Sequence, residues 1–301
     1  MTRAEGEAWS RRNERGVKAA ISLIVWIALH LGRSATRLLL YPICLYFLLF
    51  SANSGRASVD YLHRIVGRKP SFADRFRHYH HFAACVLDRV YLLNDQLDLF
   101  DVNANGEDVV LAEIVRNQGC FLFGAHIGSF EVLRALGHRQ PGLKLSLLMY
   151  EENARKINSV LDAINPNLAM GVIALGQPGS MLTVEQRLNL GHMIAILADR
   201  GLSSEDDEHC AVDFLGDPAR FPLGPFRLAA LLRRPVVLMV GLYRGGARYD
   251  VYFERLADFS DVPRERRAEA VEDALRHYVA RLEHFCRLAP YNWFNFYDFW
   301  Q

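Results

Sequence analysis

Apolar residues are concentrated near the N-terminus, in two runs at 19–31 and 38–50. The short break between them contains Gly32, Arg33 and Arg37. Neither run alone has the roughly 20 apolar residues that a membrane-spanning helix needs. One continuous span would place the two arginines near its centre, at about 2.5–3.5 kcal/mol each on insertion scales. We therefore predict a helical hairpin or an interfacial pair of helices in one leaflet, the alternative being two core helices of a soluble protein.

The residues before the first apolar run are mostly polar, and those at positions 11, 12, 15 and 18 are basic. Basic residues here suit anionic lipid headgroups and a cytoplasmic N-terminus. A secretory signal fits poorly because no small-residue cleavage site follows the apolar run. We divide the chain into a membrane-associated helical segment at 1–50 and a second domain at 51–301.

Residues 51–100 repeat apolar positions at spacings of three and four, which predicts helices. Their polar positions carry several basic residues and the run His78, His80 and His81. On a helix these histidines do not converge on one face with a carboxylate, so a metal site is not indicated. We predict a basic face that is solvated or lies against lipid.

From residue 109 onward, helical and strand patterns alternate, which predicts an α/β fold with a mainly parallel sheet flanked by helices. The predicted helices are 109–116, 129–136, 154–164, 181–190 and 226–232, with a long closing helix at 264–288. The predicted strands are 120–123, 143–149, 172–175, 193–198 and 236–242, with further strands at 212–215 and 249–255. The Gly- and Pro-rich stretch 216–225 is predicted to be an ordered loop.

Composition excludes several classes of protein. An apolar fraction of 51% and a charged fraction of 23% exclude a disordered chain. A net charge of +1 argues against a dedicated nucleic-acid binder. The five cysteines are scattered, which argues against a disulfide framework and for a reducing compartment. Of the five cysteines, only Cys210 has a histidine beside it, His209, so no zinc cluster is indicated and no metal is predicted.

The segment at 121–131 has the pattern expected of a reactive site. A buried strand ends at Gly124, and Ser129 is a good N-cap for the following helix, so His126 lies in the turn at the carboxyl end of a strand. Glu131 follows in the first helical turn. A carboxylate on one imidazole nitrogen would fix the tautomer and leave the other nitrogen as a general base. An ordinary loop histidine is the alternative.

A histidine and glutamate separated by four residues after a Gly-ending strand resembles the motif of membrane acyltransferases of the glycerolipid and lipid A type. The blocks at 196–200, 212–216 and 220–225 also resemble successive blocks of the lipid A lauroyl/myristoyl acyltransferase family. This resemblance covers nearly the whole chain. It implies an O-acyltransferase at the cytoplasmic face of the inner membrane, peripheral or monotopic, that uses no cofactor. The enzyme would move a fatty acyl group from acyl carrier protein, or coenzyme A, to a hydroxyl of a lipid acceptor.

The resemblance and the residues together give a candidate site. His126, oriented by Glu131, would remove the proton of the acceptor hydroxyl. Amides around Gly128 and Ser129, or a nearby arginine, would stabilise the oxyanion. The candidates for substrate binding are Arg155, Asn158, Asp199, Arg200, Arg220 and Gly224.

These candidates have separate expected roles. Arg200 and Arg220 would bind phosphate, the alternative being structural pairing with nearby acidic residues. Asp199 would organise the site, as the family position does, and Gly224 would shape a loop. An apolar pocket near Phe123, Phe130 and the N-terminal helices would select chain length. The basic face at 51–100 would attract an acidic carrier protein.

The C-terminal stretch 290–300 departs from the lipid A enzymes, whose last block follows a tryptophan with histidine and arginines. Here the stretch is rich in aromatic residues and has no basic side chain. This ending resembles the branch found in aryl-polyene and xanthomonadin-type pigment clusters, which favours such a lipid as acceptor over lipid A. The aromatic residues could equally pack in the core of a terminal strand.

Two other functions stay open. A lipid-binding protein of the same fold would be expected to lack His126 or Glu131, and both are present. A lipid phosphatase or hydrolase would need a metal cluster or a serine or cysteine nucleophile, and no such motif is apparent.

Overall fold

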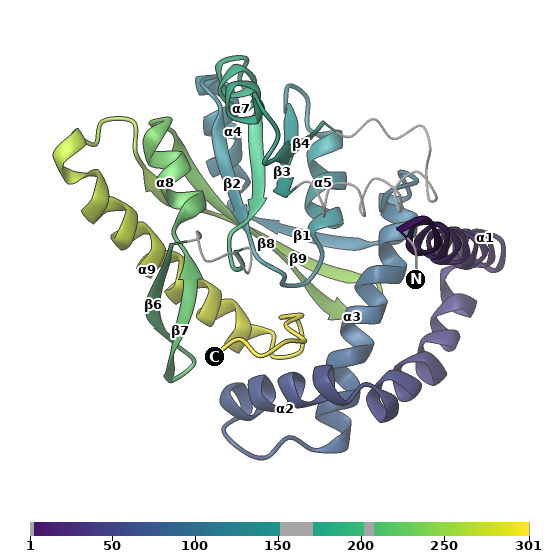
Figure 1. Ribbon diagram of the computed structural model, residues 1–301. Coiled ribbons are helices and arrows are strands. Elements are labelled where there is room, and N and C mark those ends of the chain that lie inside the picture. Colours follow the sequence, from purple (N-terminus) through teal and green to yellow (C-terminus); the bar gives the residue numbers. More distant parts are fainter. Residues whose placement is uncertain (1–2, 151–170, 202–207, 301) are drawn as a thin grey trace.

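The computed structural model describes residues 3–150, 171–201 and 208–300, and it has an α/β fold built on a seven-stranded sheet (Figure 1). The strand order is β1-β9-β8-β2-β5-β3-β4. The five strands from β8 to β4 run parallel to one another, whereas β9 is antiparallel to β8 and parallel to β1. The structure therefore confirms a mainly parallel sheet flanked by helices, and the one antiparallel pairing, between β8 and β9, makes the sheet mixed.

Most strands of this sheet follow apolar runs of the sequence, but the edge strand β1 is largely polar, and the sequence pattern does not predict it. The bounds of the strands are β1 Asp101–Asn105, β2 Cys120–Gly124, β3 Leu145–Tyr150, β4 Val172–Leu175, β5 Met193–Leu197, β8 Pro235–Gly245 and β9 Arg248–Asp258. β8 and β9 are antiparallel because a tight turn joins them, in which Gly245 and Gly246 have φ values of 91° and 61°.

A separate two-stranded hairpin consists of β6 (His209–Phe214) and β7 (Asp217–Pro222). The prediction of a loop at 216–225 is therefore wrong for most of that stretch. Ala219 and Phe221 are buried, whereas Arg220 between them is exposed, as in a strand with one buried face. The glycine and prolines obscured this alternation in the sequence.

The helices after residue 50 are α2 Ala52–Val66, α3 Phe72–Leu92, α4 Glu107–Arg116, α5 Phe130–Arg139, α7 Ser180–Asn189, α8 Gly224–Leu231 and α9 Arg267–Leu288. Short 3₁₀ turns occupy Leu97–Leu99 and Arg264–Arg266. The helix predicted at 154–164 lies outside the described residues.

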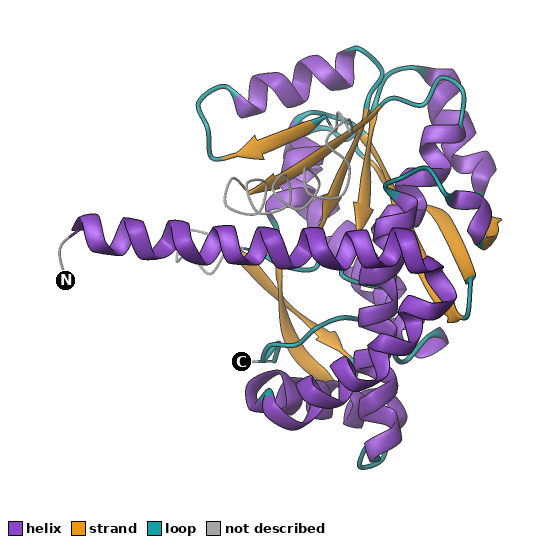
Figure 2. Ribbon diagram, turned by 90° about the vertical axis from the view of Figure 1, so that its right-hand side faces the viewer, coloured by secondary structure: helices purple, strands orange, loops and turns teal. Residues whose placement is uncertain are grey.

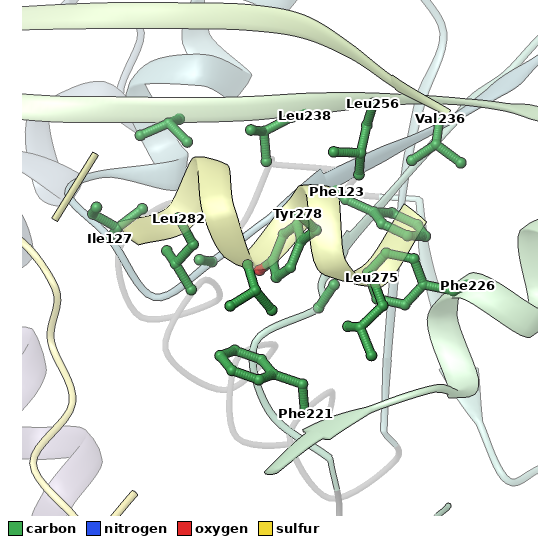
Figure 3. Packing of buried hydrophobic residues seen from close by; sticks show 14 of the residues in the cluster. Phe123, Ile127, Phe221, Phe226, Val236, Leu238, Leu256, Leu275, Tyr278 and Leu282 are labelled. Atoms are coloured by element: carbon green, nitrogen blue, oxygen red, sulfur yellow. The ribbon is translucent and has the colours of Figure 1, made fainter. Parts of the chain in front are cut away.

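The core has two halves, one on each face of the sheet. Phe121 and Phe123 of β2 pack into the half that contains α7, α8 and α9, which Figure 3 shows around Phe123. Cys120 and Leu122 pack into the other half, against residues of α1, α3, α4 and α5. β2 is thus buried on both faces, as a central parallel strand is expected to be.

The N-terminal helix α1 (Arg3–Phe50) bends sharply at Gly32, which has φ 76° and ψ 164° (Figures 1 and 2). The second half continues to α2 instead of folding back along the first half, so the prediction of a hairpin is wrong. By length and composition, Trp26–Phe50 could cross a membrane. Only 22% of its most apolar window is buried in the protein, so most of this window is not covered by the rest of the chain.

The two arginines after the bend face the protein. Asp88 of α3, which is fully buried, accepts hydrogen bonds from Nε and Nη2 of Arg33, both at 2.8 Å. Arg37 Nη1 lies 3.8 Å from the same carboxylate, and Tyr249 donates to it at 2.8 Å. The carboxylate of Asp88 is therefore a shared counter-ion for both arginines, whose side chains are only 13% and 17% exposed.

Candidate active site

His126 and Asp199 meet at the carboxyl edge of two neighbouring parallel strands. β2 pairs with β5 in a register that places Gly124 opposite Leu197. His126 and Asp199 each follow these positions by two residues, so both emerge at the same edge of the sheet. This topology brings together two residues that are far apart in the sequence.

The two side chains form an imidazole–carboxylate pair. His126 Nδ1 lies 2.9 Å from Asp199 Oδ1, and the backbone N–H of His126 donates to Asp199 Oδ2 at 3.1 Å. Asp199 is fully buried, whereas 37% of the His126 side chain is exposed. Burial acts to raise the pKa of Asp199, but His126 and Arg200 outweigh it and hold that pKa below its usual range. An ionised Asp199 accepts a hydrogen bond from Nδ1–H, and in that tautomer Nε2 is the nitrogen with a free lone pair.

Glu131 lies in the first helical turn, as predicted, but its carboxylate pairs with Arg89 and not with His126. In this turn of α5, its Oε1 forms an ion pair with Arg89 Nε of α3 at 2.7 Å. In the part of the chain that the structure describes, the carboxylate bonded to His126 is that of Asp199. The expectation that Glu131 orients His126 is therefore corrected.

The turn after His126 is held by the neighbouring backbone. Gly128 has φ 61°, and a Cβ there would lie 1.9 Å from the carbonyl oxygen of Gly241, so only glycine fits. The Gly128 amide donates to Asn292 O and the Ser129 amide donates to Gly241 O, both at 2.8 Å. The structure thus corrects the expectation that these two amides are oxyanion donors, because both already have acceptors.

The aromatic C-terminal segment packs directly against the site. It is irregular rather than a strand, and its Trp293 is fully buried. The indole Nε1 of Trp293 donates to Asp199 Oδ2 at 3.3 Å. Local sequence spacing does not predict this contact, because Trp293 and Asp199 are 94 residues apart in the chain. The core-packing interpretation of the aromatics is confirmed for Trp293, Phe294 and Phe299.

The arginines and Gly224 predicted to bind substrate occupy different places. Arg200 lies beside the site: its Nε is 3.9 Å from Asp199 Oδ2, and its Nη2 donates to Phe294 O at 2.8 Å. Arg220 is exposed on β7, outside the contacts of the His126–Asp199 pair, and Gly224 begins α8 instead of lying in a loop. Asp217, the expected partner of Arg220, pairs with Arg64.

The remaining sequence predictions concern Arg155, Asn158 and His78. Arg155 and Asn158 lie outside the described residues. His78, predicted to lie on a solvated or lipid-facing surface, is fully buried: its Nδ1 lies 2.8 Å from Ser58 Oγ and its Nε2 lies 2.8 Å from Trp293 O. Burial lowers the pKa of His78 to about 4, so that His78 is neutral at pH 7.

An apolar cavity of about 690 Å³ lies at the carboxyl edge of the sheet. Tyr150, Leu175 and Ile196, at or near the ends of β3, β4 and β5, line one side, and α8 and α9 line the other. Phe123, expected beside an apolar pocket, is fully buried against the ring of Phe226 and does not line this cavity. Among the described residues, no group of three His, Cys, Asp or Glu side chains could hold a metal ion.

The fold and the pair define an α/β protein with an acid–base site at the carboxyl edge of its sheet. The family described as bacterial lipid A biosynthesis acyltransferase matches residues 87–301, which is more than half of the chain. The protein belongs to this family and is therefore an acyltransferase. No curated protein matches the chain.

Proposed function

We propose that this protein transfers a fatty acyl group from a thioester donor to a hydroxyl of a lipid, with His126 as general base and Asp199 as its partner. The observation that carries the proposal is the bond from His126 Nδ1 to the buried Asp199, at 2.9 Å. This bond leaves Nε2 free to act on a substrate hydroxyl, and 37% of the His126 side chain is exposed.

The reaction follows from this arrangement. His126 Nε2 takes the proton of the acceptor hydroxyl as its oxygen attacks the thioester carbonyl carbon. Asp199 stabilises the imidazolium that forms. When the tetrahedral intermediate collapses, the C–S bond breaks and the imidazolium returns the proton to the departing thiolate. The oxyanion needs hydrogen-bond donors, and we assign this role to the guanidinium of Arg200, which lies beside Asp199.

The apolar cavity is a suitable site for the acyl chain. Its volume of about 690 Å³ lies within the usual range for small-molecule sites, and its lining is largely apolar. Ile196, which contributes to its lining, precedes Asp199 by three residues in the chain. A chain in this cavity would exchange water for the side chains of Leu175, Ile196 and Leu228, which favours binding.

We propose acyl carrier protein as the donor, coenzyme A being the alternative. The acceptor is proposed to be an aryl-polyene or related outer-membrane lipid, because the C-terminal segment 290–300 has no basic side chain that would suit a highly anionic lipid. Lipid A is the second candidate, and the match to the lipid A family favours it. We propose a location at the cytoplasmic face of the inner membrane, and the exposed apolar residues of α1 support contact with a membrane.

The proposal is tested by mass spectrometry of lipid extracts from cells that carry wild-type protein, His126→Ala or Asp199→Asn. We expect one lipid or pigment species to lose a single acyl mass in His126→Ala. In Asp199→Asn the rate of its formation should fall by about 10²–10⁴-fold. Asp213→Asn, an exposed position on β6, is the control and should leave the profile unchanged.

A comparison with Glu131→Gln distinguishes the two candidate carboxylates. We expect this variant to retain more activity than Asp199→Asn, because Glu131 pairs with Arg89 and not with His126. A greater loss in Glu131→Gln would contradict the His126–Asp199 pairing. Unchanged lipids in a folded, membrane-bound His126→Ala would contradict acyl transfer and favour a lipid-binding protein.

A further inference from the structure

We propose that Trp293 is a positioning residue that holds the Asp199 carboxylate in line with His126. This inference rests on the proposed function for its role in catalysis. Its structural part concerns one contact, between the indole Nε1–H and Asp199 Oδ2 at 3.3 Å. Asp199 uses its other oxygen, Oδ1, for the imidazole. The two side chains therefore bind opposite oxygens of one buried carboxylate.

The segment that carries Trp293 is fastened to the turn of His126 on both sides. Phe294 N donates to His126 O at 2.7 Å, and Gly128 N donates to Asn292 O at 2.8 Å. These two bonds place Trp293 opposite Ile127 in a short antiparallel bridge. Movement of the segment would consequently displace both His126 and the donor to Asp199.

Trp293 itself has little freedom to move. The rings of Tyr61, Phe214 and Phe299 lie 4.9–5.2 Å from its indole, all edge to face. His78 is neutral at pH 7, so its Nε2–H donates to Trp293 O, and Ser58 Oγ–H donates to its Nδ1. Helices α2 and α3 thereby fix the indole in the orientation that reaches Asp199.

The indole of Trp293 is suited to orient the buried carboxylate of Asp199 toward His126. It donates one hydrogen bond and carries no charge, so it restrains the rotation of the carboxylate without competing as an ion pair with the imidazole. Without it, Oδ2 loses a donor, and the charge of Asp199 acts more strongly on the imidazolium. We therefore expect loss of the indole to slow turnover and to move the acidic limb of the pH–rate profile to higher pH.

The test compares Trp293→Phe with Trp300→Phe in the full-length protein in detergent. Trp300 is the matched control because it belongs to the same aromatic cluster but donates to Phe214 O. With lauroyl-acyl carrier protein and a lipid extract as probes, kcat should fall about tenfold or more in Trp293→Phe, with KM within twofold. Trp300→Phe should keep the wild-type kcat and pH profile.

A second readout does not depend on turnover. With isotope-labelled histidine, the Nδ1–H resonance of His126, identified by its loss in His126→Gln, should shift in Trp293→Phe and stay in place in Trp300→Phe. Equal behaviour of the two variants would overturn the proposal. The resonance can still shift when acyl transfer is absent, so failure of the proposed function and failure of this inference are distinguishable.

If Trp293→Phe does not fold, the contact can be tested by changing Asp199 and observing the indole of Trp293. With isotope-labelled tryptophan, Asp199→Asn should shift the indole N–H resonance of Trp293 and leave that of Trp300 unchanged. An unmoved Trp293 resonance would overturn the proposal.

Discussion

His78 and Asp199 are both fully buried titratable side chains, but their surroundings favour opposite charge states. Asp199 has His126 and Arg200 beside it, which keep it ionised. His78 has a hydroxyl and a carbonyl as partners, and burial lowers its pKa from 6.5 to about 4. The charge in this part of the core is thus confined to the Asp199 site.

The depressed pKa of His78 predicts a loss of stability in acid. Between about pH 6.5 and pH 4 the unfolded chain binds a proton that the folded protein does not bind. The free energy of unfolding therefore falls as the pH falls through this window, by up to roughly 3 kcal/mol from His78. His81, whose pKa burial also lowers to about 4, adds in the same direction. Chemical unfolding at a series of pH values measures the slope.

A glutamine at position 78 keeps a donor and an acceptor but does not titrate, so His78→Gln should flatten this pH dependence. The same exchange at the exposed His138 is the control and should leave the slope as in wild type. An unchanged slope in His78→Gln would show that His78 is not the group that responds to acid.

At the residue scale, the sequence pointed to His126, Asp199 and Arg200 as site candidates, but it did not predict the contacts that Asp199 makes with His126 and Arg200. Local spacing suggested Glu131 as the partner because it is near in the chain. The actual partner comes from the neighbouring strand β5, and strand order is not readable from a single sequence. The contact of Trp293 spans 94 residues and depends on the same long-range pairing.

At the scale of elements, the bend of α1 is explained by what its second half binds. Gly32 supplies a backbone conformation with positive φ, and the next residue, Arg33, enters the bidentate pair with Asp88. From the sequence alone, placing Arg33 and Arg37 in a membrane carries a large free-energy cost, because no counter-ion is apparent nearby. Their acceptor lies 55 residues away on α3, so no local pattern reveals it.

Removing the charge of Asp88 should weaken its ion pairs with Arg33 and Arg37, which hold the second half of α1 against α3. In Asp88→Asn the buried arginine charges lose their counter-ion, so the free energy of unfolding should fall by about 3–5 kcal/mol. Protease cleavage near Gly32 should become faster as α1 loosens. Chemical unfolding and limited proteolysis in detergent measure these changes.

The control for this prediction is Glu272→Gln on α9. Glu272 pairs with Arg276 at 2.9 Å, but both side chains are at least half exposed. Breaking that surface pair should cost less than about 1 kcal/mol. Equal stability of Asp88→Asn and Glu272→Gln would contradict an anchoring role for Asp88.

The strands β2, β4 and β5 were predictable because each is a short apolar run, whereas the edge strand β1 was missed because its residues are largely polar. The predicted ranges for β2, β4 and β5 agree with the structure within one residue. β7 was missed because its prolines and the preceding Gly216 are typical of loops, while its pairing with β6 is a tertiary feature. Strand direction at β8 and β9 likewise depends on a turn that apolar spacing does not reveal.

For the whole molecule, the most unusual surface is the apolar one on α1. The helix projects from the α/β body at its N-terminal end (Figure 2). In its second half, Leu38, Leu49 and Phe50 are 69%, 62% and 71% exposed. Large apolar side chains exposed together on one element mark an interaction surface, and a lipid bilayer suits an element of this length.

We predict that these three side chains provide binding to lipid rather than stability. Replacing all three by glutamine should reduce binding to vesicles made with anionic lipids by at least about tenfold, because each apolar side chain contributes about 1.5–3 kcal/mol when fully buried. Vesicle flotation measures the bound fraction. The unfolding transition should stay close to that of wild type, since the three side chains are largely exposed in the protein.

The matched control replaces three exposed apolar residues elsewhere, Val115, Leu182 and Leu190, which are 85%, 58% and 61% exposed. They lie on or next to α4 and α7, away from α1 in the chain, so vesicle binding should not change. If both triple variants lost binding equally, general surface hydrophobicity would account for it. If neither did, α1 would need another partner, and the acceptor lipid would have to reach His126 without the bilayer contact that α1 is proposed to make.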